Sequence, residues 1–174
     1  MKLVLDIETT VTNKSPSPYK PDNYMVCVGV MPVDEPDKKK VIWFNHNELP
    51  NIDIKKSHKE LQDILDKTTL LIAHNVKFDL SWLRECGFTY DGKLWDTMIV
   101  EYLYARGQKI ALSLSESCKR WGVTEKKSEL VEELFKSGTG FEAIPKDIVE
   151  EYNLYDLLSC GDLFATQYKM LQDD

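Results

Sequence analysis

Long uninterrupted runs of apolar residues are absent from the sequence. A membrane-spanning helix needs about 18 or more such residues in succession, and no segment of the 174 residues approaches this length. The apolar run that follows Lys2 is short and already contains acids, which argues against a secretory signal peptide. Internal repeats, low-complexity blocks and a convincing domain boundary are also absent. We therefore expect residues 1–174 to form one soluble globular domain with no membrane partner.

Cysteine is scarce and scattered. The sequence contains four cysteines and no CxxC pair, which argues against a zinc site or a disulfide framework. We expect reduced thiols that mostly fill the core of a cytoplasmic protein. The four residues are Cys27, Cys86, Cys118 and Cys160.

An excess of positive charge is missing as well. The formal net charge of −7 argues against a protein that coats nucleic acid through bulk electrostatics. An enzyme that grips a short strand locally remains compatible with this charge. A cluster of acids that binds divalent cations would itself contribute to the negative total.

The order of the apolar segments predicts an α/β fold. Short apolar runs indicate strands, and apolar positions that recur every three or four residues indicate helices. The predicted strands cover residues 3–10, 25–31, 40–44, 69–75 and 94–96. The predicted helices cover residues 56–67, 76–86, 97–107, 112–122, 127–138 and 145–171. The chain begins with three strands, continues with strands that alternate with helices, and ends mostly in helices. This order predicts a mixed sheet covered by helices.

Two acids stand at the end of the first predicted strand, LVLDIETT. Side chains two apart on a strand point to the same side, so Val4, Asp6 and Glu8 share one face. The opposite face is apolar too, which predicts a central strand covered on both sides. Two like charges at such a position repel each other and resist desolvation, so positive charge is expected beside them.

Two further acids interrupt apolar helix faces. Asp79, in VKFDLSWL, shares its face with Trp82, and Asp156, in YNLYD, shares its face with Tyr152 and Leu163. An acid in such a stripe is uncommon without a partner. For Asp79, a solvated boundary position is the alternative explanation.

Other acids have structural explanations. Asp96 precedes TMIVEYL, where N-capping of a helix accounts for it without any chemistry. Glu101, Glu150 and Glu151 are expected to face solvent. These residues are therefore left out of the predicted site.

The four misplaced carboxylates suggest one site. A site that collects all four would be untenable without cations, and carboxylate oxygens are the ligands that suit Mg²⁺ and Mn²⁺. Two such ions about 3.5–4 Å apart are a standard means of in-line attack at a phosphodiester. The residues concerned are Asp6, Glu8, Asp79 and Asp156.

Three segments carry a family resemblance. In this order, LDIETT, HNVKFDLSWL and YNLYD resemble the three motifs of the DEDD (DnaQ-like) 3′–5′ exonuclease superfamily. WDTMIVEYL and LSLSESCKRWG are similar to segments in the proofreading domain of family A DNA polymerases. The resemblance extends from Asp6 to about Phe164. It implies a ribonuclease H-like fold, in which a mixed sheet of about five strands is flanked by helices on both faces.

The third motif divides this superfamily into a tyrosine and a histidine branch. Tyr152 precedes Asp156 by four positions, and Glu151 occupies the place where a histidine would stand. The chain therefore resembles the tyrosine branch. His74 lies five residues before Asp79, but that is the second motif, so we interpret it as a strand-end residue near the site.

The resemblance also implies roles for the site residues. Asp6, Glu8 and Asp156 would hold the tighter of two divalent cations, Mg²⁺ or Mn²⁺, with Asp6 shared by both. Asp79 would hold the second cation largely through water. Tyr152 would orient the attacking water, because a free phenol titrates near about 10 and is a poor base at neutral pH.

Four further positions match residues that contact the substrate in the family. Thr9 and Thr10 match contacts to the terminal nucleotide, and Asn75 and Phe78 match positions that hold the 3′ end. Phe78 replaces a frequent tyrosine, so a hydroxyl contact is lost, although an aromatic ring still stacks on a base. A core position in its helix is the alternative for Phe78. Several basic residues would contact the phosphate backbone of a bound strand, and the alternative is that they lie on solvated helix faces. They are Lys77, Arg106, Lys109, Lys119, Arg120, Lys126 and Lys127.

The leading hypothesis is a metal-dependent 3′–5′ exonuclease that acts on single-stranded DNA or DNA 3′ ends. The alternatives are an exoribonuclease resembling RNase D, which the 2′-hydroxyl would distinguish, and a non-catalytic module that binds DNA or a polymerase. Because Met1 lies close to the first motif, we expect a small stand-alone protein, working alone or with a separate DNA polymerase. A bacterial or viral replication context is expected.

Overall fold

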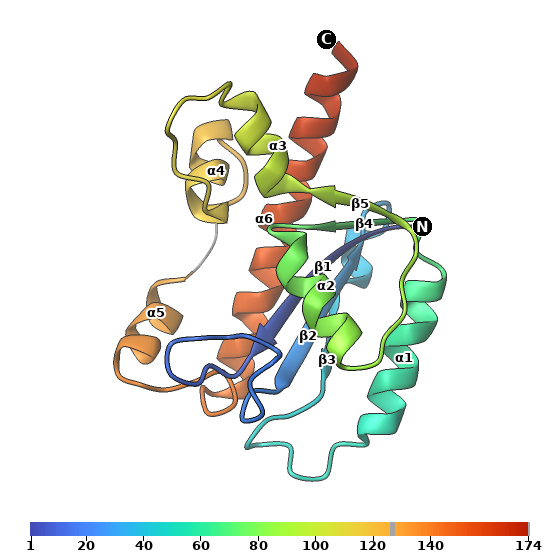
Figure 1. Ribbon diagram of the computed structural model, residues 1–174, viewed down its shortest axis with the longest axis vertical. Coiled ribbons are helices and arrows are strands. Elements are labelled where there is room, and N and C mark those ends of the chain that lie inside the picture. The colour runs from blue at the N-terminus through green and yellow to red at the C-terminus, as the bar shows by residue number, and fades with distance from the viewer. Residues whose placement is uncertain (126–127, 174) are drawn as a thin grey trace.

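The computed structural model describes residues 1–125 and 128–173 and contains a five-stranded mixed sheet (Figure 1). The strand order is β3-β2-β1-β4-β5, so β1 lies in the middle. β2 and β3 form the antiparallel half, whereas β4 and β5 run parallel to β1 and to each other. The bounds are β1 Lys2–Thr9, β2 Met25–Pro32, β3 Lys40–Trp43, β4 Leu70–Ala73 and β5 Lys93–Asp96. The prediction of a mixed sheet of about five strands is confirmed.

Six α-helices and a short 3-10 helix are found among the described residues. The longest, α6, has 28 residues and runs along the sheet to the C-terminal end in Figure 1. None of the described helices combines the length and the apolar character needed to cross a membrane. The bounds are η1 Pro36–Lys38, α1 Ile54–Asp66, α2 Val76–Glu85, α3 Thr97–Tyr104, α4 Leu114–Trp121, α5 Glu129–Lys136 and α6 Lys146–Asp173.

Helices cover both faces of the sheet. Leu3, Leu5 and Ile7 of β1 pack in one apolar cluster with residues of α1 and α2. Val4, which points to the other face, packs in a second cluster with Leu157 and other residues of α6. The alternation predicted for the first strand therefore places its even-numbered side chains beneath α6. Because Asp6 and Glu8 continue that even series, their carboxylates are directed to the α6 face.

The cysteines follow the predicted pattern. All four are free, and Cys27, Cys118 and Cys160 are buried. Burial raises the pKa of each of these thiols, to about 12 for Cys118, and the charges of Glu8 and Asp6 raise the pKa of Cys27 further. These three side chains are accordingly neutral thiols that fill the core.

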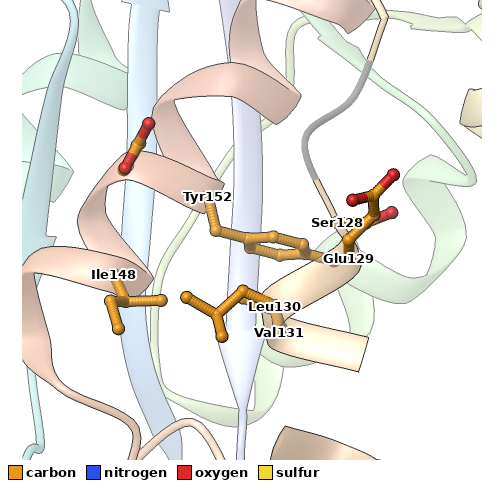
Figure 2. Close-up of a pocket in the computed structure, with 7 residues that line it drawn as sticks. Ser128, Glu129, Leu130, Val131, Ile148 and Tyr152 are labelled. Atoms are coloured by element: carbon orange, nitrogen blue, oxygen red, sulfur yellow. The ribbon is translucent and has the colours of Figure 1, made fainter. Parts of the chain in front are cut away.

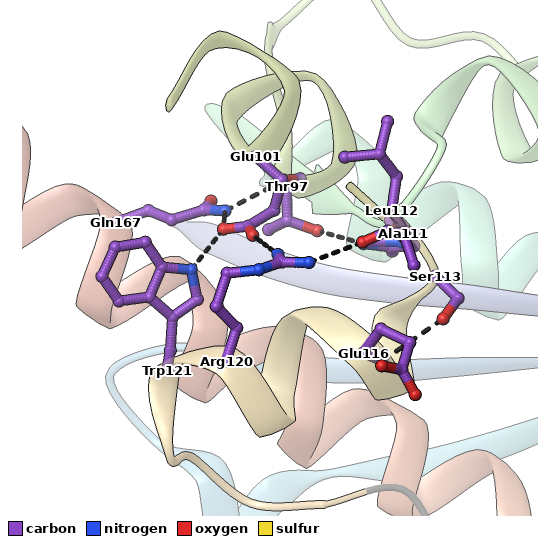
Figure 3. A network of polar contacts seen from close by, with 10 residues as sticks. Thr97, Glu101, Ala111, Leu112, Ser113, Glu116, Arg120, Trp121 and Gln167 are labelled. Carbon is purple, nitrogen blue, oxygen red and sulfur yellow. Dashed lines mark hydrogen bonds and ion pairs between the residues drawn. The ribbon is translucent and has the colours of Figure 1, made fainter. Parts of the chain in front are cut away.

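The prediction that Glu101 faces solvent is wrong. Its side chain is only 1% exposed and contacts α4 and α6 (Figure 3). Arg120 forms an ion pair with its carboxylate, and Trp121 Nε1 and Gln167 Nε2 donate to Oε1 at 2.5 and 3.0 Å. The partners lie 19 to 66 residues away in the sequence, so the local pattern carried no sign of them.

The orientation of α3 explains the error. This helix buries Thr97 and Glu101, whereas its apolar residues Ile99, Tyr102 and Leu103 are more than half exposed. A hydrophobic pattern assigns the apolar side of a helix to the core. Here the polar side faces inward because it finds partners on α4 and α6.

Candidate active site

Three carboxylates converge between the sheet and α6. Asp6 and Glu8 come from β1 and Asp156 comes from α6, and one oxygen of each lies within 4.8 Å of the others. Glu8 and Asp156 are buried and Asp6 is half-buried. Of the four acids singled out in the sequence, the structure thus brings three into one group.

The fold explains why these acids meet. β1 is the central strand, and its end carries Asp6 and Glu8 at the face that α6 covers. The register of β1 with β2 shifts directly after Glu8, and an irregularity of this kind redirects the side chains beside it. On α6, Asp156 is flanked by the core residues Leu157 and Cys160, which fix the height of the helix over the strand.

Asp79 approaches the same strand from the opposite side. It lies on α2 and is 3% exposed, and its Oδ1 accepts a hydrogen bond from the backbone N–H of Ile7 at 3.2 Å. Burial raises the pKa of this carboxyl well above its usual range, and the nearby charge of Asp6 raises it further. Asp79 is therefore a neighbour of Asp6 but not a member of the three-carboxylate group among the described residues.

An Asp79→Asn variant is expected to be more stable than the wild type at neutral pH in EDTA. A raised pKa means that the folded state holds the proton more tightly than the unfolded chain, so ionisation costs stability as pH rises. Asparagine keeps an acceptor for Ile7 and removes this cost. We expect a gain of roughly 1 kcal/mol, or about 2–4 °C in melting temperature for a domain of this size.

The pH dependence provides the check. Melting temperatures of both proteins would be measured in EDTA from about pH 8 to pH 4, a range that ends near the ordinary aspartate pKa. The difference should shrink towards zero at the acidic end, where Asp79 of the wild type is protonated. A variant that is less stable than the wild type at pH 7 would contradict the unfavourable ionisation of Asp79.

Tyr152 lies one helical turn before Asp156 on α6 and lines a pocket (Figure 2). Its ring is directed towards the start of α5 and packs against Phe141, with ring centroids 5.6 Å apart. The pocket has a volume of about 450 Å³. Its lining residues are Ser128, Glu129, Leu130, Val131, Ile148, Glu151 and Tyr152. The tyrosine predicted to orient water thus forms one wall of a pocket whose lining includes none of the three grouped acids.

The predicted substrate-contact residues lie at the end of β1 and at the start of α2. Thr9 and Thr10 are buried, and the Thr10 hydroxyl accepts a hydrogen bond from Tyr24 N at 2.8 Å. Asn75 is exposed in the left-handed conformation at the N-cap of α2. Phe78 is partly buried and packs against the core cluster beneath α2. It therefore has the core contacts that the alternative interpretation proposed, while part of its ring remains accessible.

Asp96 has the structural role that was predicted. It caps α3 by accepting hydrogen bonds from Met98 N and Ile99 N at 2.9 and 3.4 Å. The same carboxylate also accepts from the backbone N–H groups of Asn75 and Val76 at 2.9 and 3.0 Å. One aspartate thereby fixes the starts of α2 and α3 together.

His74 follows β4 and contacts the start of α3 and the segment that precedes α4. Its Nδ1 lies 2.9 Å from Thr97 Oγ1 and its Nε2 lies 2.8 Å from the carbonyl oxygen of Leu112. These contacts agree with the interpretation of His74 as a strand-end residue.

The predicted basic stretch divides into several groups. Arg120 is committed to the Glu101 ion pair, and Lys119 pairs with Glu116. Lys77, Arg106 and Lys109 are exposed. Lys126 and Lys127 lie outside the described residues.

Asn153 is a residue of the site that was not predicted from the sequence. This residue is completely buried on α6, and its side-chain amide donates to Asp6 Oδ2 at 2.9 Å and to Glu8 Oε1 at 3.3 Å. Its position on the Asp156 side of α6 was a signal, because it stands three residues before Asp156. An asparagine carries no charge, however, and the site was predicted from charged side chains that lacked a partner.

The donor set fits a divalent cation. Three carboxylates within 4.8 Å of one another form a concentrated negative charge that is largely removed from water. Oxygen donors of this type suit Mg²⁺ and Mn²⁺. The described residues of the site contribute carboxylates rather than histidine or thiolate to the group, which argues against zinc.

Comparison with known proteins agrees with this chemistry. A family model described as 3′–5′ exonuclease matches residues 43–138. A DNA polymerase of Bacillus phage SP01 is 40% identical over 57 residues, which cover 32% of this chain and 6% of the polymerase. The family match includes Asp79, but it leaves out β1 and α6 with the other three acids.

Solved structures share the fold. The Brucella melitensis NrnC bound to pGG superposes with a TM-score of 0.61 and 22% identity, covering 99% of this chain and 74% of NrnC. A structure described as the apo form of the nuclease gives a TM-score of 0.68 at 17% identity, with coverage of 99% and 74%. The family B DNA polymerase of Pyrobaculum calidifontis gives 0.65 at 16% identity, over 98% of this chain and 24% of the polymerase. The fold is the ribonuclease H-like fold that the resemblance implied.

Proposed function

Because the chain belongs to the 3′–5′ exonuclease family, we propose that residues 1–174 form one exonuclease domain that removes nucleotides from the 3′ end of DNA. The observation that carries the proposal is the convergence of Asp6, Glu8 and Asp156 within 4.8 Å. A nuclease site of this family needs such a carboxylate group, and it is assembled here from opposite ends of the chain. Single-stranded DNA or a DNA 3′ end is the proposed substrate.

Each site residue has a proposed role. Asp6, Glu8 and Asp156 would hold one divalent cation, and Asp79 with Asp6 would hold a second. When bound, two such cations supply electrostatic stabilisation to the attacking and leaving oxygens of a phosphodiester. Mg²⁺ and Mn²⁺ are the candidates, and a Brucella melitensis NrnC structure with Mg²⁺ shares the fold.

Tyr152 would orient the attacking water. A neutral phenol donates and accepts hydrogen bonds but is a poor base at neutral pH. It stands one helical turn before Asp156 on α6, and its ring lines a pocket. This arrangement supports assignment to the tyrosine branch.

The 3′ end would be held by residues that follow the strands. Thr9 and Thr10 continue directly from the metal-binding acids of β1, and Asn75 and Phe78 stand at the start of α2 beside Asp79. Phe78 would stack on the terminal base, a contact worth about 1–3 kcal/mol in single-strand binders. The exposed Lys77 precedes Phe78 in the sequence and would contact a phosphate of the bound strand.

An RNA substrate is the second candidate. The observation that favours it is the fold shared with Brucella melitensis NrnC, which was solved with pGG bound. The DNA polymerase of phage SP01 and the polymerase-type motifs favour DNA. A non-catalytic DNA- or polymerase-binding module would not need all four acids together with Tyr152, so we place it last.

The test is a cleavage assay on matched strands. The purified protein would be incubated with 5′-labelled single-stranded DNA or with RNA of the same sequence, in Mg²⁺, Mn²⁺ or EDTA, beside an Asp6→Ala control. We expect a ladder that shortens from the 3′ end of DNA, requires metal and is absent in the variant. Degradation of RNA alone would mean that the substrate is RNA and not DNA. A folded protein that cleaves neither strand would refute the enzymatic function.

A further inference from the structure

One buried amide lies among the candidate metal ligands. Asn153 is 0% exposed and stands on α6 between Tyr152 and Asp156. Its Nδ2 donates to Asp6 Oδ2 at 2.9 Å, to Glu8 Oε1 at 3.3 Å and to the backbone oxygen of Asp6 at 3.3 Å. A single side chain of α6 therefore bridges both acids of β1.

The hydrogen bonds from Asn153 reduce the repulsion between the two carboxylates at the end of β1. Asp6 and Glu8 repel each other, and a carboxylate removed from water needs donors to remain ionised and ordered. The amide supplies partial positive charge without adding a cation that would compete with a divalent ion. A carboxylate offers about four lone-pair sites, so accepting a hydrogen bond from Asn153 is compatible with metal coordination by the same acid.

Gly29 provides the space for this amide. It is the residue of β2 paired with Asp6, and residues 25–31 of this apolar strand are all buried. A Cβ at position 29 would lie 1.8 Å from Asn153 Oδ1 and 2.8 Å from its Cγ. Glycine inside a strand weakens it, and its presence often marks a close approach. The close approach here is made by the side chain of Asn153.

We propose that Asn153 is a positioning residue that holds Asp6 and Glu8 in the metal-binding arrangement. Gly29, which has no side chain, leaves the space that the Asn153 amide occupies against the sheet. This inference rests on the proposed function, because it concerns the same carboxylate group. Hydrogen-bond partners of metal-binding carboxylates orient them and tune their affinity. Asn153 would perform this task for both β1 acids at once.

The first experiment measures binding of Mn²⁺ alone by isothermal titration calorimetry. We expect Asn153→Ala to bind Mn²⁺ about 10–100-fold more weakly than the wild type, the range found for such supporting residues. Cleavage by the variant should recover as the Mn²⁺ concentration is raised, whereas the KM for DNA at saturating metal should stay unchanged. Ser159→Ala is the matched control, because Ser159 is an equally buried residue of α6 that lies beside Cys118.

The second experiment uses Gly29 to displace Asn153 without touching an acid. Gly29→Ala should weaken Mn²⁺ binding in the wild-type background, since the new Cβ occupies the place of the amide. In an Asn153→Ala background, the two nearest contacts of this Cβ are removed, and the third, with the end of the Leu157 side chain at 3.0 Å, remains. The double variant should therefore bind Mn²⁺ no more weakly than Asn153→Ala, a clear departure from additivity.

The outcomes are distinguishable. Wild-type protein that binds no Mn²⁺ would overturn the proposed function and this inference with it. Wild-type binding together with equal affinity of Asn153→Ala would overturn the inference alone. A lowered melting temperature of metal-free Asn153→Ala with unchanged Mn²⁺ affinity would mean that the amide only supports packing, and that also refutes the inference.

Discussion

Asp6→Asn is expected to lower the rate of 3′-end cleavage by about 10²–10³-fold, since single charge-stabilising groups in active sites contribute about that factor. Asp6 is linked to three features of the candidate site. It belongs to the three-carboxylate group, its charge raises the pKa of Asp79, and its side chain accepts from Asn153. Single-turnover cleavage of 5′-labelled DNA at saturating Mg²⁺ would measure the loss.

The melting temperature of the variant distinguishes a loss of catalysis from a loss of the folded structure. Replacing one of several crowded carboxylates relieves like-charge repulsion, so the metal-free variant should melt no lower than the wild type. Asp63→Asn, which changes an exposed acid of α1, is the matched control and should retain full activity. A rate for Asp6→Asn within tenfold of the wild type would contradict the assignment of Asp6 as a metal ligand.

Arg120→Leu is expected to destabilise the protein by about 3–5 kcal/mol, the usual cost of leaving a buried charge without its partner. The Glu101 side chain is 1% exposed, and Arg120 is the cation that pairs with it (Figure 3). Arg120 also donates to the carbonyl oxygen of Ala111 at 2.6 Å, so a further bond is lost. At about 2–4 °C per kcal/mol, thermal unfolding should show a clear decrease in melting temperature.

A second substitution tests the cause. Glu101→Gln in the Arg120→Leu background removes the unpaired charge but keeps an oxygen for Trp121 Nε1 and Gln167 Nε2. This double variant should recover most of the lost stability. If it were as unstable as Arg120→Leu, the loss would come from packing of the arginine and not from the buried carboxylate.

The four acids stand out in the sequence because each breaks a local rule. Asp6 and Glu8 end a strand that is apolar on both faces, and Asp79 and Asp156 interrupt helical stripes that are otherwise mostly buried. Local periodicity is visible in a sequence, so violations of it are visible too. The central place of β1 in the sheet followed from the same pattern.

Glu101 and Asn153 were not predictable in this way. The burial of Glu101 depends on Arg120, Trp121 and Gln167, which reach it from two other helices. The role of Asn153 depends on a glycine of β2 that leaves room for its amide. Contacts between distant segments decide both cases, and periodicity within one segment carries no information about them.

The assembly of the carboxylate group from β1 and α6 has a consequence for biosynthesis. Asn153 follows Asp6 by 147 residues, so a ribosome has made most of this chain before the elements of the site can meet. Until α6 is synthesised and docked, Asp6 and Glu8 lack both the third carboxylate and the bridging amide. Nuclease activity therefore should not precede completion of the fold, and partly synthesised chains would leave nucleic acid near the ribosome intact.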